Sequence, residues 1–241
     1  MQKYEKILKT QIFDDFFVYL QKFSIVKCMR YFVVILISSI IRVNSCAQEL
    51  SQAVDLGLSV NWASHNIGAC TPFEYGTYLA WAEKEPKNRY WFDTYKYTND
   101  QECEQCLEDL GESICGTEYD MARQLWKGDW RLPTNTEILE LRDKCIWEWT
   151  QREGINGFTV TGPSGNYIFL PAGGFISCEK NEEFGRMCSY WGGTKSFIRN
   201  AHTIWACVDE EDGNVIVKCW GDYRPMGRLT RPVIDKTQST K

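Results

Sequence analysis

The sequence contains only two histidines, His65 and His202, among 241 residues. Hydrolytic nucleophiles need a base beside them, and histidine is the usual one. His65 lies in a turn after the first predicted strand and His202 precedes a later strand, so we interpret both as structural residues. The sequence therefore favours a non-catalytic protein, although its many Asp and Glu residues leave a carboxylate pair open.

Positive charge is also scarce. The chain has 27 Lys and Arg against 32 Asp and Glu, which gives a formal net charge of -5 at pH 7. A nucleic-acid binder presents a basic patch or run, and outside the N-terminal stretch this sequence has none. The charge balance therefore excludes a nucleic-acid partner.

Long hydrophobic runs are missing as well. A charge-free stretch at residues 31–41 is closed by Arg42, whereas a helix that crosses a bilayer needs about 20 apolar residues. A basic start at Met29, this apolar stretch and a zone of small residues together indicate a signal at residues 29–47. We therefore predict that residues 1–28 are an upstream extension outside the mature protein.

Two processing routes are open at the end of this signal. Ordinary cleavage fits the small residues Ser45 and Ala47, whereas the run before Cys46 resembles a relaxed lipoprotein box. A lipid on Cys46 would attach the protein to a membrane surface without a spanning segment. Either route predicts export: an outer-membrane lipoprotein, a cell-surface protein or a secreted one.

The 11 cysteines fit export, because disulfides form in oxidising compartments. Two pairs bracket a turn and are candidates for disulfides: Cys207 with Cys219, and Cys178 with Cys188. A three-residue loop centred on Gly213 would place Cys207 and Cys219 opposite each other, within bonding reach.

A further cysteine group contains a C-x-x-C knuckle, the start of many zinc sites: Cys103, Cys106 and Cys115. No second knuckle follows, and neither histidine lies nearby in the sequence. We interpret residues 99–118 as an acidic surface insertion with a local disulfide or free thiols, and we expect no zinc.

The domain begins with alternating apolar and polar residues. From Val54 to Trp62 every second residue is apolar, which is typical of a half-buried strand. An aromatic-rich extended stretch follows at residues 75–81. Strands are therefore expected to open the domain.

Helix signals follow between residues 119 and 149. Residues 121–126 can form a short helix that ends at Gly128. A capping box begins a second helix, because the Thr134 side chain can accept from a first-turn amide while the Glu137 carboxylate reaches back to the Thr134 amide. The residues predicted to face the core recur at helical spacing: Ile138, Leu141 and Cys145.

Strand patterns return after the helix. We predict one hairpin with its turn at residues 162–166, a second with its turn at 209–214, and a closing strand over 229–234. Strands at both ends bracket a helical middle. The sequence therefore predicts one compact α+β domain over 53–235, mostly antiparallel sheets with one or two helices, and a disordered tail over 236–241.

Several blocks of this domain, in order, resemble those of a known family. They are VDLGLSVNWA at 54–63, WAEKEPK at 81–87, GDWRLPT at 128–134, NGFTVTG at 156–162, FLPAGG at 169–174, YW at 190–191 and RPV at 231–233. The chain resembles the Fibrobacter succinogenes major paralogous domain from about Val54 to Ile234. This resemblance implies a C-type-lectin-like fold and an exported protein of Bacteroidetes-type bacteria, and it implies no established activity.

Calcium-dependent sugar binding needs about six to eight oxygen ligands. Sugar-binding C-type lectins use Glu-Pro-Asn or Gln-Pro-Asp, but this sequence has Glu85-Pro86-Lys87, with an ammonium where the amide should be. The remaining calcium candidates lie in the acidic turn: Asp209, Glu211, Asp212 and Asn214. A solvated hairpin tip explains this turn equally well, so we expect no cofactor.

Aromatic residues in a predicted loop offer a calcium-free route. Trp91, Tyr95 and Tyr97 can stack on apolar sugar faces or anchor a protein partner. The sequence thus predicts an exported, non-catalytic binding module for a glycan or an extracellular protein. The alternatives are a structural or adhesive part of a surface assembly and, through the Arg-Leu-Pro-Thr block, an enzyme of the formylglycine-generating type.

Overall fold

The structure of this chain is a computed structural model, and it describes residues 52–100 and 106–236. Several predictions fall outside these residues: those on 1–28, the signal at 29–47, Cys46, Cys103 and the tail after Lys236. The described residues belong to one compact unit.

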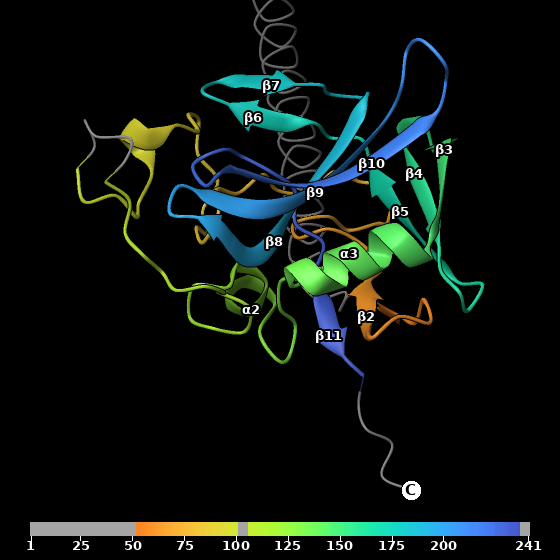
Figure 1. The fold of residues 1–241 in the computed structure, drawn as a ribbon, viewed down its shortest axis with the longest axis horizontal. Helices are drawn as coiled ribbons and strands as arrows, with labels where there is room; N and C mark the ends of the chain where they lie inside the picture. The colour runs from red at the N-terminus through yellow and green to blue at the C-terminus, as the bar shows by residue number, and fades with distance from the viewer. Residues whose placement is uncertain (1–51, 101–105, 237–241) are drawn as a thin grey trace, which may run out of the picture. The chain divides into compact units, whose positions relative to one another are not determined.

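Short antiparallel sheets hold most of this unit, with two α-helices in its middle (Figure 1). In chain order the elements are β1 (Ala53–Val54), β2 (Val60–Ala63), the 3-10 helix η1 (Phe92–Thr94), α2 (Met121–Trp126), α3 (Asn135–Lys144), β3 (Ile146–Arg152), β4 (Ile155–Thr161), β5 (Tyr167–Pro171), β6 (Phe175–Ser177), β7 (Lys180–Glu182), β8 (Met187–Phe197), β9 (Asn200–Val208), β10 (Val215–Tyr223) and β11 (Val233–Asp235). The predicted α+β class is confirmed.

The first and last strands of the domain share one sheet. β2 pairs with β1 on one side and with β11 on the other, so that Trp62 lies opposite both Val54 and Val233. The amide of Arg131 donates to the carbonyl oxygen of Val233 at 3.0 Å, which ties the middle of the chain to this sheet. The two ends of the domain therefore meet, as the sequence predicts.

The alternating segment 54–62 is not one strand, so that prediction is wrong. Gly57 has a φ of 80°, and its amide donates to Oδ1 of Asp55 at 2.8 Å, so the chain turns there and its two halves pair as β1 and β2. The alternation of burial is nevertheless present, because Asp55 and Ser59 are exposed. The apolar residues that alternate with the polar ones are buried: Leu56, Leu58, Val60 and Trp62.

Both predicted helices are present. At the start of α3, Oγ1 of Thr134 accepts from the Glu137 amide at 3.3 Å and Oε2 of Glu137 accepts from the Thr134 amide at 2.7 Å. Ile138 and Leu141 are fully buried, and Cys145 packs half-buried against the same core. No helix in the described ranges is long and apolar enough to cross a membrane.

Two three-stranded sheets follow, in the orders β3-β4-β5 and β10-β9-β8. Both predicted hairpins are confirmed, with Thr161 opposite Tyr167 in one and Val208 opposite Val215 in the other. The sequence did not predict β3, which begins directly after α3, nor the paired β6 and β7, nor β8. The predicted closing strand is shorter than expected and is confined to β11.

The β9–β10 hairpin does not align its two cysteines. Cys207 lies opposite Ile216 and Cys219 lies opposite Ile204, and both thiols are free. The predicted disulfide is therefore wrong, because the turn takes up all of residues 209–214 and shifts the register away from that of a three-residue loop.

The second predicted disulfide is also wrong, since Cys178 and Cys188 are free. The backbone of Cys178 pairs with Tyr90, whereas Cys188 is buried in β8 and its Sγ donates to the carbonyl oxygen of Leu170 at 2.9 Å. Burial holds the pKa of the Cys188 thiol well above its usual range. Two other cysteines are disulfide-bonded: Cys70 and Cys106.

Three arginines in the last part of the chain are buried: Arg224, Arg228 and Arg231. The guanidinium of Arg231 donates to four oxygens from distant segments: the carbonyls of Ala63 (3.0 Å), Ser64 (2.9 Å) and Phe169 (2.7 Å) and Oδ1 of Asn66 (2.7 Å). Buried carbonyls need such donors where no strand supplies them. Arg231 therefore links the N-terminal sheet to β5.

Candidate functional site

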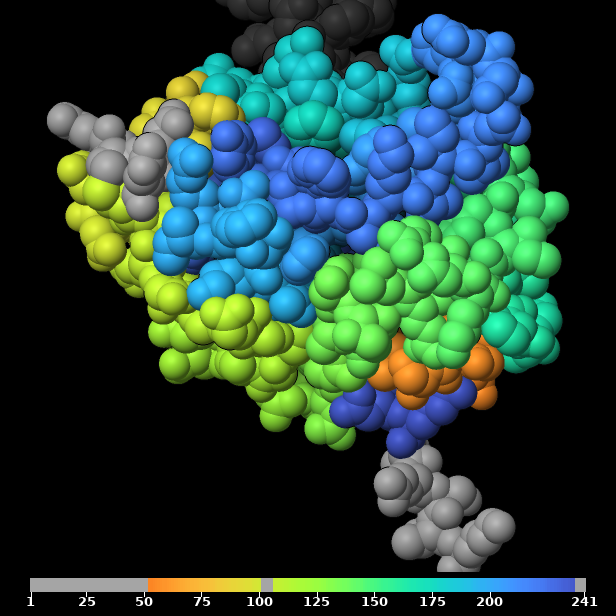
Figure 2. Space-filling view, viewed as in Figure 1, coloured from red at the N-terminus to blue at the C-terminus, as the bar shows by residue number. Residues whose placement is uncertain are grey.

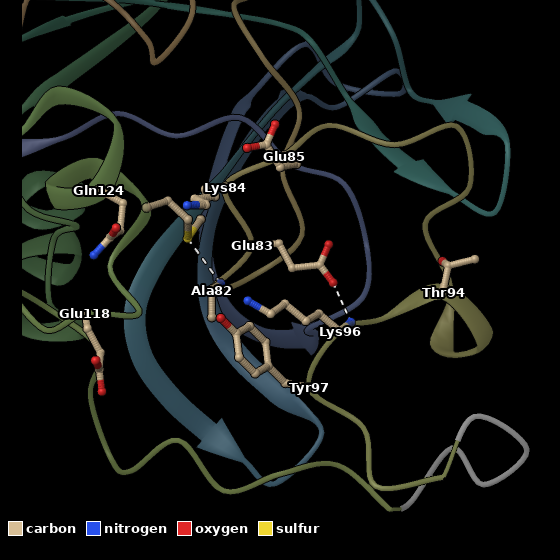
Figure 3. A pocket seen from close by; sticks show the side chains of 10 residues that line it. Ala82, Glu83, Lys84, Glu85, Thr94, Lys96, Tyr97, Glu118 and Gln124 are labelled. Atoms are coloured by element: carbon tan, nitrogen blue, oxygen red, sulfur yellow. Dashed lines mark hydrogen bonds between the residues drawn. The ribbon is translucent and has the colours of Figure 1, made fainter.

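A pocket of about 240 Å³ opens between the segment 82–97 and the start of α2 (Figure 3). Its walls combine charged, amide, hydroxyl, aromatic and thioether groups. The lining residues are Ala82, Glu83, Lys84, Glu85, Thr94, Lys96, Tyr97, Glu118, Met121 and Gln124.

Two buried aromatic residues fix the ends of the segment that forms one wall. Nε1 of Trp81 donates to the carbonyl oxygen of Gly192 at 2.9 Å, and the hydroxyl of Tyr95 donates to the carbonyl oxygen of Trp81 at 2.8 Å. Both side chains are almost completely buried. The chain between them is therefore held by the core while its other side faces the pocket.

An internal ion pair stiffens the same wall. Oε2 of Glu83 lies 2.6 Å from Nζ of Lys87, and Oε1 of Glu83 accepts from the amide of Lys96 at 2.6 Å. Nζ of Lys87 also donates to the carbonyl oxygen of Thr94 at 3.0 Å. Both side chains of the pair are largely buried, where such contacts are stronger than at the surface. Glu83 and Lys87 therefore brace the loop.

The opposite wall is positioned by Asp120, the N-cap of α2. Its fully buried carboxylate accepts from four backbone amides, those of Gly116, Ala122, Arg123 and Leu132. Burial raises the pKa of this carboxyl above its usual value, against the opposing effect of these amides. Asp120 thus fixes the helix that brings Met121 and Gln124 to the pocket.

Groups of complementary chemistry lie on two sides of the pocket. Figure 3 shows the Gln124 amide and the Glu118 carboxylate on one side and the Lys96 ammonium and Tyr97 ring on the other. Nζ of Lys96 lies 5.0 Å from the centre of the Tyr97 ring, and that ring packs edge-on against Tyr119 at 5.6 Å. The pocket therefore offers one oriented ring with hydrogen-bond donors and acceptors around it.

The three aromatic residues predicted to bind a ligand have different positions. Tyr97 lines the pocket. Tyr95 is 1% exposed, and its hydroxyl accepts from Nε of Arg224 at 3.1 Å, so it belongs to the core. Trp91 is half-buried and packs edge-on against Phe92 and Tyr223, away from the pocket lining. Of the three residues, only Tyr97 lines the pocket, and its role in binding stays a prediction.

Asp209 and Asp212, two of the calcium candidates, accept hydrogen bonds within their own turn. Oδ1 of Asp209 accepts from the Glu211 amide at 2.8 Å, and the Asp212 carboxylate accepts from the Asn214 amide at 2.9 Å and from its side chain at 2.6 Å. These oxygens therefore cap their own turn. Within residues 52–100 and 106–236, no group of three or more His, Cys, Asp or Glu side chains could hold a metal ion.

Several pocket residues were not predicted from the sequence. Glu118 and Gln124 lie more than 20 residues after Tyr97, one in the supposed acidic insertion and one on the exposed side of a helix. No local pattern marks either of them. Both histidines lie outside the pocket: His65 packs against Trp126 at 5.4 Å between ring centres, and His202 lies in β9.

Comparison with known proteins does not identify a family for this chain. The chain matches no protein-family model, no curated protein and no solved structure. The function is therefore argued from the pocket itself.

Proposed function

We propose that this domain is a non-catalytic binding module of an exported or surface-attached protein, and that the pocket binds one sugar unit of a glycan. The observation that carries this proposal is the Tyr97 ring in a braced pocket, with Gln124 and Glu118 across from it and Lys96 beside it. Polar groups of both kinds around one ring suit a ligand with an apolar face and a rim of hydroxyls.

The size and the rigidity of the pocket support this ligand class. Its volume of about 240 Å³ is below the range of roughly 300 to 1,000 Å³ that holds drug-sized ligands, so a single sugar unit fits better than a longer segment. Both walls are fixed before binding, one by the Glu83–Lys87 pair and one by Asp120. A preformed site avoids most of the ordering cost of binding.

The resemblance to the Fibrobacter succinogenes major paralogous domain supports the same reading. The proposal includes a C-type-lectin-like fold. The pairing of β2 with β11, which brings the two ends of the domain together, supports it. The block at 81–87 contains the Glu83–Lys87 brace, and the block at 128–134 ends at the N-cap of α3. Export through the signal at 29–47 would bring the pocket into contact with extracellular glycans.

A glycan array followed by calorimetric titration of the best sugar tests the proposal. We expect Tyr97→Ala and Gln124→Ala each to weaken binding by about tenfold or more, because each removes a direct contact. Gln124 is exposed on α2, so its variant should keep the fold even if Tyr97→Ala loses packing against Tyr119. Tyr167→Ala, an exposed tyrosine on β5, is the matched control and should bind like the wild type.

Two results would overturn this function. One is a wild-type domain that binds no glycan on the array, whether or not it captures a protein. The other is a sugar whose affinity is the same in the wild type, Tyr97→Ala and Gln124→Ala, because the sugar would then bind elsewhere.

A further inference from the structure

Strand β10 forms one edge of its sheet. The order is β10-β9-β8, and within the described residues β10 pairs along its whole length with β9 alone. Nine residues at the edge of a sheet present a row of backbone amides and carbonyls that can pair with another strand. In the space-filling view the blue atoms of the β9–β10 hairpin lie on the visible face, next to the green atoms of α3 (Figure 2).

The outer face of β10 carries a tryptophan between two opposite charges. Lys218, Trp220 and Asp222 alternate along the strand and therefore share one face. Trp220 is 67% exposed, which is a large exposed fraction for a tryptophan. Nζ of Lys218 lies 5.4 Å from the centre of the Trp205 ring on β9, so the neighbouring strand adds a second ring to this face.

The sequence of β10 is complementary to itself in one antiparallel register. When two copies pair about a two-fold axis at Trp220, the two Trp220 rings meet, and Lys218 of each copy lies opposite Asp222 of the other. The side chains stay on the correct faces, because paired residues differ by an even number of positions. In a register centred on Lys218 the two ammonium groups would face each other, which is destabilising.

Asp222 can serve both sides of such an interface. Its Oδ2 pairs with the buried Arg228 and its Oδ1 accepts from the Tyr223 amide at 2.8 Å, while 33% of the side chain remains exposed, so that a lysine of a second copy can still reach the carboxylate. On the opposite face of the strand, Cys219 interacts with Arg142 of α3. The outer row of β10 is therefore the side on which the pairing residues are exposed.

We propose that β10 is a self-association edge: two copies of this chain pair β10 with β10, antiparallel and centred on Trp220, to join their sheets. The interface is isologous, since the same strand supplies both sides. It uses none of the pocket residues, so it stands or falls independently of glycan binding.

Light scattering on the full chain over a range of concentrations tests the association. Between about 1 and about 100 μM, where small interfaces associate, the mass of the wild type should rise from 28.0 kDa toward twice that value. Trp220→Ala should raise the dissociation constant about tenfold or more, as loss of a central tryptophan does. Lys218→Glu should do the same, because it places like charges opposite each other.

Tyr167→Ala is the control, since this exposed tyrosine lies on β5 in another sheet. Its dissociation constant should equal that of the wild type. A single mass near 28.0 kDa at all concentrations would overturn the proposal, and so would a dimer that neither Trp220→Ala nor Lys218→Glu weakens.

The register has its own test. In a Cys219→Ser background, Trp220→Cys should give a disulfide-linked dimer on mild oxidation with copper phenanthroline, because residue 220 faces its own copy; both cysteine variants are oxidised at a concentration at which Trp220→Ala still dimerises. Lys218→Cys in the same background should give none above the level of Cys219→Ser alone. Equal cross-linking of the two variants would contradict pairing at Trp220.

Discussion

Two charged regions of this protein, the segment 224–231 and the turn 209–214, use their charges in opposite ways. The arginines of the first region point inward. Arg224 and Arg231 donate mostly to backbone carbonyls of segments far away in the sequence, whereas Arg228 donates to the side chains of Ser189 and Asp222. In the second region, Asp209 and Asp212 accept from amides of their own turn, and Glu210 forms an exposed ion pair with Arg186. Removing the first set would disconnect parts of the fold, whereas removing the second would affect only a hairpin tip.

The difference shows what replaces regular hydrogen bonding in a loop-rich domain. Chain crossings leave carbonyl groups that no neighbouring strand satisfies, and a guanidinium has five donors in a fixed plane that can reach several of them. Carboxylates at a tip have water as an alternative, so their contacts contribute little. The pocket wall contains carboxylates of both kinds. Glu83 is largely buried and paired with Lys87, whereas Glu118 is exposed and can contact a ligand.

The largest effect is expected from Arg231→Met. This change keeps an apolar stem of similar length but leaves the oxygens around Arg231 without their donor, so the free energy of unfolding should fall by about 3 to 5 kcal/mol. Arg186→Met, at a position where 61% of the side chain is exposed, should change it by less than about 0.5 kcal/mol. Urea unfolding of both variants measures the contrast, and equal midpoints would break the comparison.

A smaller contrast is expected between two glycines with positive φ. A Cβ at Gly76 (φ 80°) would lie 2.3 Å from the carbonyl oxygen of Ile67, whereas a Cβ at Gly213 (φ 72°), in the acidic turn, would have nothing within 4 Å. Gly76→Ala should therefore cost about 3 kcal/mol or more, from strain and overlap together, and Gly213→Ala about 1 to 2 kcal/mol from strain alone. Thermal unfolding checks the order, and a larger loss in Gly213→Ala would contradict it.

Local patterns predicted the parts of the fold that depend on neighbouring residues. The capping box at Thr134 and the two hairpins need only nearby residues, and each is present. The predicted alignment of Cys207 with Cys219 failed because it assumed a three-residue loop, whereas the turn takes up residues 209–214. β3 was missed because its strand begins within the helical pattern after Lys144, where tertiary pairing with β4 decides the structure.

The candidate site was predictable only in part, because it is assembled from separate segments. Tyr97 and Tyr95 look alike in the sequence, yet one lines the pocket and the other reaches Trp81 in the core. What separates them is Arg224, which lies more than 120 residues later and whose Nε donates to the Tyr95 hydroxyl. Such a partner cannot be identified from a single sequence.

The smallest effect concerns His202, which lies on β9 with its ring partly removed from solvent. Burial lowers the pKa of His202 below 6.5, so the folded state binds the proton less well than the unfolded state does. The stability gained from the neutral ring is complete above pH 6.5 and is lost as the pH falls below that value toward the folded pKa. The urea midpoint should therefore decrease between about pH 7.5 and about pH 5.5, and His202→Gln should flatten this decrease. An unchanged slope in His202→Gln would assign the pH dependence of the urea midpoint to another group. His202 would then contribute as little to stability as the exposed carboxylates of the turn, unlike the buried arginines.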